Sequence, residues 1–419
     1  MSAPDTVRTP EPRTGAARGG FRALLVAQAL SALGDSFSYV AIPLLVLHTT
    51  GSLAQMGVVT GLGGAASLLT GLFAGVVVDR FDRRRLLVLC GLARFALYAS
   101  IPLTWLGGPQ PWLLYLVLPL ASAFATVFQV AQVTVVPSLV PAGQITHANG
   151  RLFAASSTAY LVGPALAGLL AGRFGATAAI GFDAVTFAVS AVALMSLPPA
   201  LAVLPTGRDG AVGEQRSLDV FLAGLRFIRR HPLLRTLTAL LTVLTAVTFG
   251  LTDVLIYHLK HGLGRSDGTV GYVLTAGVVG TLLASVLVAR LRRRLGFTVT
   301  WVGAWALCGV AMAGIGLAGS APLVALAATG VLCCTGVAGI ASMSLRQEVT
   351  PPHLLGRVTA AFWTLQKALA PLGAAALTGA AAVYGVPATL AAAGALCTAT
   401  ALAALLTPLR SRTPAVPGP

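Results

Sequence analysis

The sequence predicts an all-α protein that crosses a membrane many times. Of its 419 residues, 56% are hydrophobic and only 10% are charged, whereas soluble domains carry roughly 25% charged residues. The apolar residues gather in many runs of about 20, the length of a helix that spans a bilayer. Regular alternation of apolar and polar residues in short segments is missing, so the pattern favours a helical bundle over a β-barrel.

Twelve apolar segments follow one another along the chain. Those of the first half are expected at 22–47, 56–78, 86–105, 112–136, 152–171 and 178–199. Those of the second half are expected at 236–257, 270–289, 297–317, 323–343, 358–382 and 388–406. An even number of spans places both ends of the chain on the same side of the membrane.

The basic residues of the loops predict which side that is. If the N-terminus lies inside, the inner segments hold 23 arginines, and the outer loops hold only Arg173, Lys260 and Arg265. Cytoplasmic loops carry an excess of Lys and Arg. We therefore expect a multi-pass protein of the cell membrane with both termini in the cytoplasm. The same loops account for the net charge of +16, so we expect no nucleic-acid partner.

The long inner connection after the sixth span predicts two halves. We expect a disordered cytoplasmic tail, a six-helix bundle, a cytoplasmic linker, a second six-helix bundle and a second tail, at 1–21, 22–199, 200–235, 236–406 and 407–419. The linker starts with turn-forming residues and continues as an amphipathic helix on the inner membrane surface. Ser217 is its predicted N-cap, and its apolar residues are Val220, Leu222, Leu225 and Ile228.

The two halves resemble each other in sequence. VVVDRFDRRR at 76–85 is similar to VLVARLRRRL at 286–295, and two further pairs follow in the same order, at 139–151 with 348–358 and at 160–168 with 367–375. An internal repeat of this kind is typical of transporters built from two similar bundles, with the substrate site near the midplane at their interface. We therefore expect two pseudo-symmetric bundles that enclose a central site.

The loop after the second span resembles the signature loop of the major facilitator superfamily. The motif G-x-x-x-D-R-x-x-R-R falls on Gly75, Asp79, Arg80, Arg83 and Arg84. Topology explains the arginines but not Asp79, and the second half has Ala289 at the matching position. Our hypothesis is a gating loop: Asp79 latches the inner ends of the two halves in the outward-facing state, by accepting from backbone donors near Thr359.

The fifth span carries a Gly-Pro motif similar to that of the superfamily's antiporters. The motif falls on Gly163, Pro164 and Gly168, and the usual leading glycine is Ala159 here. A proline inside a helix removes a backbone donor and kinks the span, and the small residues permit close helix contact. A bias toward antiport is implied by the resemblance alone.

Further segments resemble the exporter branch that includes enterobactin exporter-like and macrolide efflux proteins. They include SALGDSFSYVAIPLLV in the first span and GLRFIRRHPLLR in the linker, and the resemblance covers roughly 22–406. Neighbouring branches of drug exporters have an arginine in the fourth span, where this chain has Gln129 and Gln132. A coupling mechanism that depends on that arginine is therefore not implied.

Two acids inside the spans are candidates for proton coupling or for a place in the substrate cavity. A charge at the centre of a spanning helix costs about 2.5–3.5 kcal/mol, so each needs a reason. Asp35 in the first span is the first candidate, with a structural role against the local backbone as the alternative. Asp253 lies in the corresponding helix of the second half, nearer the outer face.

Other polar side chains in the spans leave alternatives open. Lys367 is either the counter-ion of one of these acids or a binding group for an anionic substrate. Gln129 and Gln132 offer hydrogen bonds to a substrate or to a neighbouring helix. Arg94 is expected to be structural, reaching the acids of the signature loop or the inner surface. Asp183, near the outer start of the sixth span, is expected within reach of water.

Together these observations predict a secondary active transporter. We expect proton-coupled efflux of a hydrophobic or amphiphilic small molecule by alternating access, through a cavity with an apolar and aromatic lining from Phe37, Tyr39, Phe128 and Trp363. The alternatives are an uptake carrier and a non-transporting membrane sensor with a transporter fold. An ATP-driven pump is disfavoured because the chain has no G-x-x-x-x-G-K-[ST] motif.

The expected partners are the small-molecule substrate, protons and the lipid bilayer, and we expect a monomer. We expect no enzymatic activity, because the six histidines are dispersed and mostly lie in loops. No cofactor and no metal are expected either. The five cysteines lack metal-ligand spacing and are predicted to be buried thiols: Cys90, Cys308, Cys333, Cys334 and Cys397.

Overall fold

The computed structural model is helical throughout the residues it describes. These are residues 14–141, 144–197, 222–351 and 354–410. They include 11 helices that are long and apolar enough to cross a membrane. One of them, α10 (Asp267–Leu317), joins two spans at Gly296, whose φ of 77° interrupts the helix and favours glycine. The twelve expected spans are therefore all present. The predicted tails lie largely outside the described residues.

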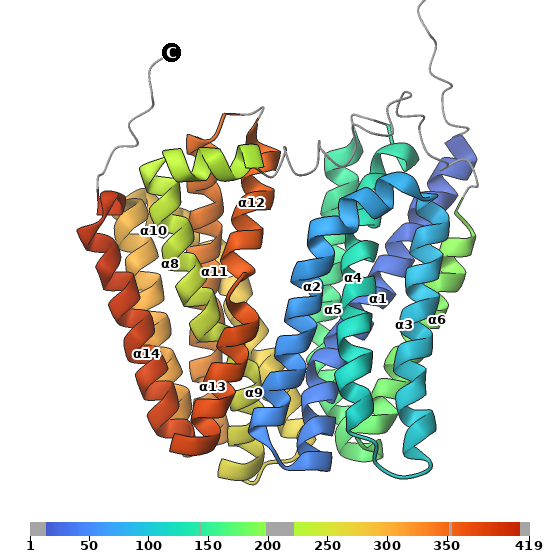
Figure 1. Ribbon diagram of the computed structural model, residues 1–419, viewed down its shortest axis with the longest axis horizontal. Helices are drawn as coiled ribbons and strands as arrows, with labels where there is room; N and C mark the ends of the chain where they lie inside the picture. The colour runs from blue at the N-terminus through green and yellow to red at the C-terminus, as the bar shows by residue number, and fades with distance from the viewer. Residues whose placement is uncertain (1–13, 142–143, 198–221, 352–353, 411–419) are drawn as a thin grey trace, which may run out of the picture.

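The first half forms a bundle of six helices (Figure 1). They are α1 (Thr14–Thr50), α2 (Leu53–Arg80), α3 (Arg83–Trp105), α4 (Trp112–Leu139), α5 (Ile145–Phe174) and α6 (Ala176–Met195). Local chemistry sets several of the turns between them. Ser52 caps α2 and Asp82 caps α3, each through its side-chain oxygen. Gly175, with a φ of 86°, separates α5 from α6.

The second half contains two interrupted spans. Its helices are α8 (Pro232–Phe249), α9 (Leu251–Tyr257), the π-helical turn η3 (His258–Gly262), α10, α11 (Ala321–Val349), α12 (Leu355–Lys367), α13 (Ala370–Tyr384) and α14 (Val386–Ala403), followed by short 3-10 turns, η5 (Ala404–Leu406) and η6 (Pro408–Arg410). We expected 236–257 and 358–382 to be continuous. Gly250 instead separates α8 from α9. A second break, before Pro371, separates α12 from α13, because proline cannot continue the hydrogen bonding of the preceding turn.

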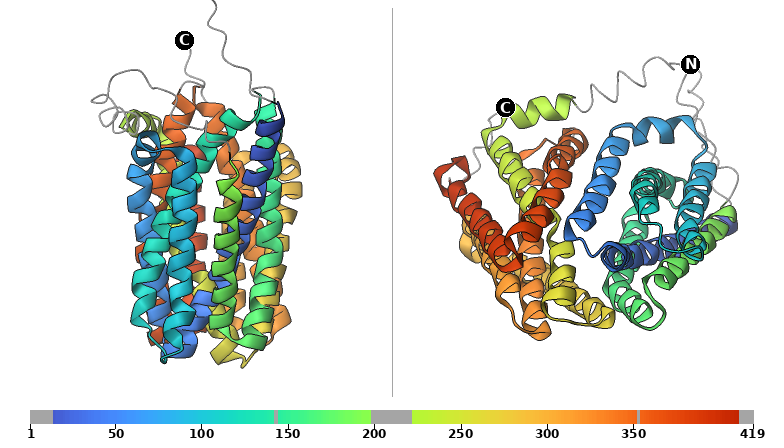
Figure 2. Two further views of the ribbon diagram at one scale, coloured as in Figure 1. Left: turned by 90° about the vertical axis from the view of Figure 1, so that its right-hand side faces the viewer. Right: turned by 60° about the horizontal axis from the view of Figure 1, so that its bottom comes forward.

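The two bundles lie side by side and meet at one end only (Figure 1). We call the end where α1 begins and α14 finishes the terminal side, and the opposite end the far side. Within each bundle the helices run roughly along one direction (Figure 2). Between the bundles, α5 packs on α10 and α2 packs on α13. These contacts include Gly168 on Gly271 and Gly57 on Thr378, which are close to the far-side ends of their helices. The molecule is thus closed on the far side.

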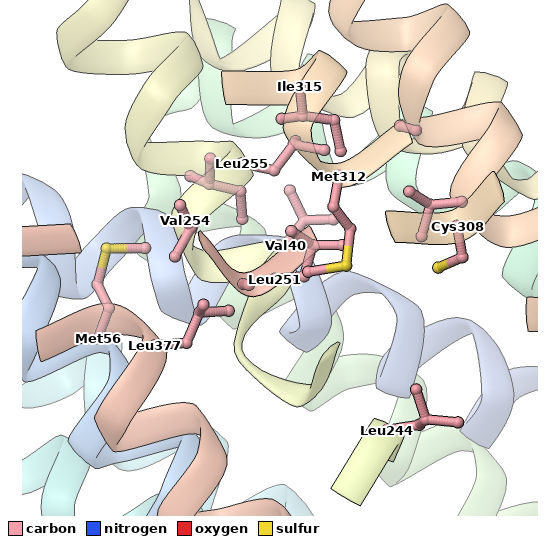
Figure 3. Packing of buried hydrophobic residues seen from close by; sticks show 14 of the residues in the cluster. Val40, Met56, Leu244, Leu251, Val254, Leu255, Cys308, Met312, Ile315 and Leu377 are labelled. Carbon is pink, nitrogen blue, oxygen red and sulfur yellow. The ribbon is translucent and has the colours of Figure 1, made fainter. Parts of the chain in front are cut away.

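A buried apolar cluster that spans both bundles supports this closure. Figure 3 shows Val40 of α1 and Met56 of α2 in the same cluster as Val254, Leu255 and Leu377 of the second bundle. Separating the bundles on the far side would expose these side chains to water. Burying each aliphatic side chain is worth about 1.5–3 kcal/mol, so the cluster stabilises the state in which the far side is closed.

The described part of the linker helix, 222–230, packs across the terminal side of the second bundle (Figure 1). The predicted N-cap Ser217 and Val220 lie outside the described residues. Ile228 is buried, and Gly224 lies so close to the start of α12 that a Cβ there would overlap the carbonyl oxygen of Arg357. The helix therefore contacts the protein through a backbone-to-backbone approach as well as through its apolar face.

We expect Gly224→Ala to loosen this helix from α12. The backbone of Arg357 cannot yield to a methyl group, and overpacking of this kind costs about 1–3 kcal/mol. Cleavage by trypsin after the exposed Arg226 and Arg229 should then be about tenfold faster, because proteolysis follows the population of the open form. Gly356→Ala is the control, since a Cβ at Gly356 meets no atom within 4 Å. Equal cleavage of both variants would show that the helix is not held by this contact.

Candidate functional site: a cavity between the two bundles

A cavity of about 980 Å³ lies between the two bundles, with walls from α1 to α4 on one side and from α8 to α12 on the other. Small-molecule sites are typically 300–1,000 Å³, so it is large enough for a drug-sized ligand. Of the side chains predicted for the site, Asp35, Gln129, Asp253 and Lys367 line it. Gln132, one turn further along α4, is buried and does not line the cavity.

The aromatic lining differs from the expected set. Tyr39 and Trp363 line the cavity, whereas Phe37 and Phe128 are buried within the first bundle. Phe37, for example, packs on Phe182 with ring centres 5.3 Å apart. The expectation for Phe37 and Phe128 is therefore wrong, because hydropathy does not say which face of a spanning helix looks into the cavity. The further aromatic side chains of the lining are Tyr98, Phe249, Trp305 and Phe362.

Asp35 forms an ion pair with Arg94 of α3. The Arg94 side chain is only 2% exposed, against 27% for Asp35. Its guanidinium group also donates to Ser31 Oγ at 3.1 Å, and its Cζ lies 3.8 Å from the centre of the Phe187 ring. Arg94 therefore fixes Asp35 at the cavity wall. We expected Arg94 to extend to the acids of the signature loop or to the inner surface. That expectation is wrong, because its partner is Asp35.

Asp183 lies behind this ion pair and is fully buried. It accepts a hydrogen bond from Ser38, while its second oxygen, Oδ1, has no hydrogen-bond partner in the described part of the chain. Helix α1 comes so close here that a Cβ at Gly34 would overlap that oxygen. The expectation that water reaches Asp183 from the outer surface is therefore wrong.

Asp253 lies on the second-bundle side, where the bundles meet. Its side chain is 2% exposed, and no cation of the described residues lies within 4.0 Å of it. Thr60 of α2 lies close to its carboxyl group, and its Oδ2 atom has no hydrogen-bond partner among the described residues. The adjacent Thr252 shares a hydrogen bond with Tyr39 of α1. The first turn of α9 thus makes polar contacts with both α1 and α2 of the opposite bundle.

Two cations lie in the second-bundle wall. Lys367 is the last residue of α12, and its Nζ lies 5.6 Å from the centre of the Trp363 ring. Arg346 of α11 is 1% exposed, and its Cζ lies 4.2 Å from the Phe362 ring centre. We expected Arg346 in an inner loop, because the predicted span ended at 343. Small and apolar residues continue at helical spacing up to Arg346, at the buried positions Val337, Ala338, Ala341, Ser342 and Leu345. This spacing could have shown from the sequence that the helix includes Arg346.

The signature loop joins three helices of the first bundle. The Asp82 carboxylate accepts from the backbone of Arg85 at 2.7 Å. Arg83 donates to the carbonyl of Thr134 in α4, and Arg84 donates to that of Met195, the last residue of α6. The carbonyl of Met195 is one of those that lack a partner at a helix end, and Arg84 satisfies it. A Cβ at Gly75 would meet no atom within 4 Å. The Asp79 side chain is outside the described part of the structure, so the proposed contact between Asp79 and the backbone near Thr359 remains a prediction.

The Gly-Pro motif of α5 makes close contacts on two sides. A Cβ at Gly163 would overlap Ser36 of α1 in the same bundle, and one at Gly168 would lie 2.6 Å from the Cα of Gly271 in the other. An ionic contact lies next to this seam, where Asp267 Oδ1 is 2.6 Å from Lys260 Nζ and 3.4 Å from His48 Nε2. His48 belongs to α1, so the His48–Asp267 contact and the Gly168–Gly271 contact hold the two bundles together on the far side.

Two bundles of six spans that are closed at one end and enclose a cavity at their interface are the architecture of many secondary transporters. The chain belongs to the Major Facilitator Superfamily, whose sequence model matches residues 24–374. The protein is accordingly a polytopic membrane transporter of small molecules and not an enzyme.

The relatives include named exporters. Over 376 residues the chain is 30% identical to the multidrug efflux pump Tap of Mycobacterium tuberculosis (strain ATCC 25618 / H37Rv), with 85% of each chain covered. It is 29% identical over 367 residues to Tap of Mycolicibacterium fortuitum, covering 86% of this chain and 88% of that one. It is 27% identical over 376 residues to the enterobactin exporter EntS of Escherichia coli (strain UTI89 / UPEC), covering 85% and 84%.

Solved transporters share the fold at low sequence identity. The nucleoside transporter NupG has a TM-score of 0.73 at 15% identity, covering 92% of this chain and 98% of that one. A bacterial homolog of the human lysosomal transporter Spinster, in an inward-facing and unoccupied conformation, has a TM-score of 0.71 at 15% identity, covering 97% and 100%.

Proposed function

We propose that the protein exports a hydrophobic or amphiphilic small molecule in exchange for protons. The observation that carries the proposal is Asp253, a buried carboxyl group without a nearby described cation, at the point where a ligand cavity meets the contact between the bundles. The named efflux relatives support export, and the aromatic lining supports a hydrophobic or amphiphilic substrate. Uptake is the alternative direction.

Asp253 is our first choice for the proton carrier. Burying an isolated carboxylate is far more costly than burying the neutral acid, so this side chain exchanges its proton only when water reaches it through the cavity. The neutral acid is able to donate to Thr60 across the bundle interface, whereas the carboxylate only accepts. Its protonation therefore changes the contact between the bundles. Asp35 is the second candidate, because a proton on it would release Arg94.

The two-bundle geometry also supports a working cycle within one chain. Both walls of the cavity come from the same polypeptide, so we propose a monomer that alternates between a cavity open on the terminal side and one open on the far side. We place it in the cell membrane with the terminal side in the cytoplasm, as the arginine-rich loops predict. In this cycle the signature loop would close the terminal side.

We expect Asp253→Asn to lose pH-driven transport while keeping substrate binding. The amide cannot gain or lose a proton but retains nearly the same size, so a fall of at least about tenfold in gradient-driven dye transport is expected in proteoliposomes. Exchange of dye at equal pH on both sides should persist. Glu348→Gln is the matched control, since Glu348 is an exposed acid that lies outside this cavity.

Two results would contradict the proposal. Normal pH-driven transport by Asp253→Asn would remove that residue as the carrier. Unchanged efflux from cells after a protonophore has collapsed the gradient would remove protons as the driving ion. Net accumulation of the dye in cells that carry the protein would favour the uptake alternative.

A further inference from the structure

The second-bundle wall of the cavity presents hydrogen-bond donors that lack acceptors. Arg346 Nε and Trp305 Nε1 are both buried and both belong to residues that line the cavity. Neither atom has a hydrogen-bond partner among the described residues. Arginine, lysine and the indole of tryptophan donate and never accept. Both atoms are shielded from water in this conformation, so a side-chain movement on binding would let a ligand supply the missing acceptor, because leaving a buried donor unpaired is unfavourable.

The same wall carries positive charge that its neighbours do not neutralise. In the part of the chain that the structure describes, no carboxylate lies within 4.0 Å of Arg346 or Lys367. Glu348, two residues after Arg346, is occupied by Arg292, with both contacts at 2.8 Å. Of the two acids that line the cavity, Asp35 is paired with Arg94. Asp253 remains, and it is turned toward Thr60 of the other bundle.

Aromatic rings lie beside both cations. The Trp363 ring centre is 5.8 Å from Arg346 Cζ and 5.6 Å from Lys367 Nζ. Trp363 is half-exposed and lines the cavity. A ligand that brings an anionic group to the cations would therefore meet an aromatic surface next to it. This combination suits an acid attached to a flat apolar body.

We infer that the transported substrates are amphiphilic anions, such as aromatic carboxylates, sulfonates or phenolates. Arg346, Lys367 and Trp305 bind the anionic group, and Trp363 packs on the apolar part. This inference rests on the proposed function and adds the charge of the substrate to it. No carboxylate of the described residues lies within 4.0 Å of either cation, and the anionic group of the substrate provides the counter-charge.

Three probes with the same naphthalene ring test the inference: naphthalene-2-sulfonate, 2-naphthalenemethanol and 2-naphthylmethylammonium. Isothermal titration of the purified full-length protein should show that the sulfonate binds at least tenfold more tightly than the alcohol or the ammonium. Arg346→Gln and Lys367→Gln should each weaken sulfonate binding about tenfold and leave the alcohol unchanged. Arg290→Gln, at an exposed position outside the cavity, should change neither.

The inference is overturned if the alcohol or the ammonium binds as tightly as the sulfonate, or if both cavity variants keep the full preference for the anion. Lys367→Gln keeps the test valid if Arg346→Gln does not fold, because Lys367 is exposed in the cavity. Arg346→Lys should restore most of the preference, since it restores the charge. A pH gradient that moves neutral and cationic dyes as well as anions would contradict this inference and leave the proposed function standing. Tight sulfonate binding without gradient-driven transport would contradict the proposed function and leave the inferred preference for anions standing.

Discussion

Gly168→Leu is expected to prevent closure of the far side and to abolish transport. In the closed seam, a Cβ at Gly168 would lie 2.6 Å from the Cα of Gly271 and 2.8 Å from the carbonyl oxygen of Asp267. Both neighbours are backbone atoms, which cannot rotate away. A single extra methylene in a packed contact costs about 1–3 kcal/mol, and leucine adds several. A shift of about 5.5 kcal/mol inverts a conformational ratio from 99:1 to 1:99.

Spin labels in the far-side loops measure this outcome. The distance between labels at positions 107 and 320, one in each bundle, should lengthen in Gly168→Leu and report a single open population. Gly303→Leu is the control, because a Cβ at Gly303 meets no atom within 4 Å. The protein should still insert and purify, since the three atoms nearest to a Cβ at Gly168 all belong to the other bundle. An unchanged distance distribution together with normal transport would show that this seam does not govern closure.

Arg94→Met is expected to be the most destabilising of the substitutions considered for the first bundle. The arginine is buried, and its removal leaves the carboxylate of Asp35 without its partner close to the buried Asp183. Breaking a buried ion pair from one side typically costs about 3–5 kcal/mol. Methionine keeps much of the volume beside Phe187, so the loss reflects charge more than packing. Thermal unfolding in detergent, followed by tryptophan fluorescence, should show a clearly lower midpoint.

A double-mutant cycle separates the ion pair from other effects. Asp35→Asn combined with Arg94→Met should be more stable than Arg94→Met alone, because no unpaired charge remains at Asp35. Arg173→Met, at an exposed position on the far side, should leave the midpoint unchanged. If the double variant is no more stable than Arg94→Met, the ion pair with Asp35 is not what makes Arg94 important.

Depth in the membrane was predictable from the sequence, but orientation around each helix axis was not. Hydropathy averaged over a span predicts where the chain crosses, and the twelve crossings and the two bundles follow from it. It does not tell whether Phe37 or Tyr39 faces the cavity, because both lie in the same apolar run, and packing against Phe182 buries one of them. Asp35 and Arg94 each lie near the middle of their spans, but we expected Arg94 to reach the signature loop or the inner surface, and only the packing of α1 and α3 on α6 shows the ion pair.

Hydropathy averaged over a span also does not show where a helix breaks or how far it extends. The break between α12 and α13 lies just before Pro371, within a run whose hydropathy alone indicates a continuous helix. Arg346 lies beyond the apolar core of its span, and only the spacing of the small and apolar residues before it shows that α11 continues. The proposed substrate site is sensitive to both features, since Lys367 ends α12 and Arg346 packs on Phe362.

The interrupted spans of the second bundle have a mechanical consequence. The six helices of the first bundle are each continuous, although four of them contain prolines that remove single backbone hydrogen bonds, whereas the second bundle has joints at Gly250 and at residues 368–369. An unbroken helix resists bending along its whole length, but a joint without continuous hydrogen bonds is locally compliant. Both joints adjoin the cavity, with Asp253 beyond one and Lys367 at the other. The pseudo-symmetric halves therefore differ in where a helix ends and restarts within a span: in the second bundle, this happens beside the cavity.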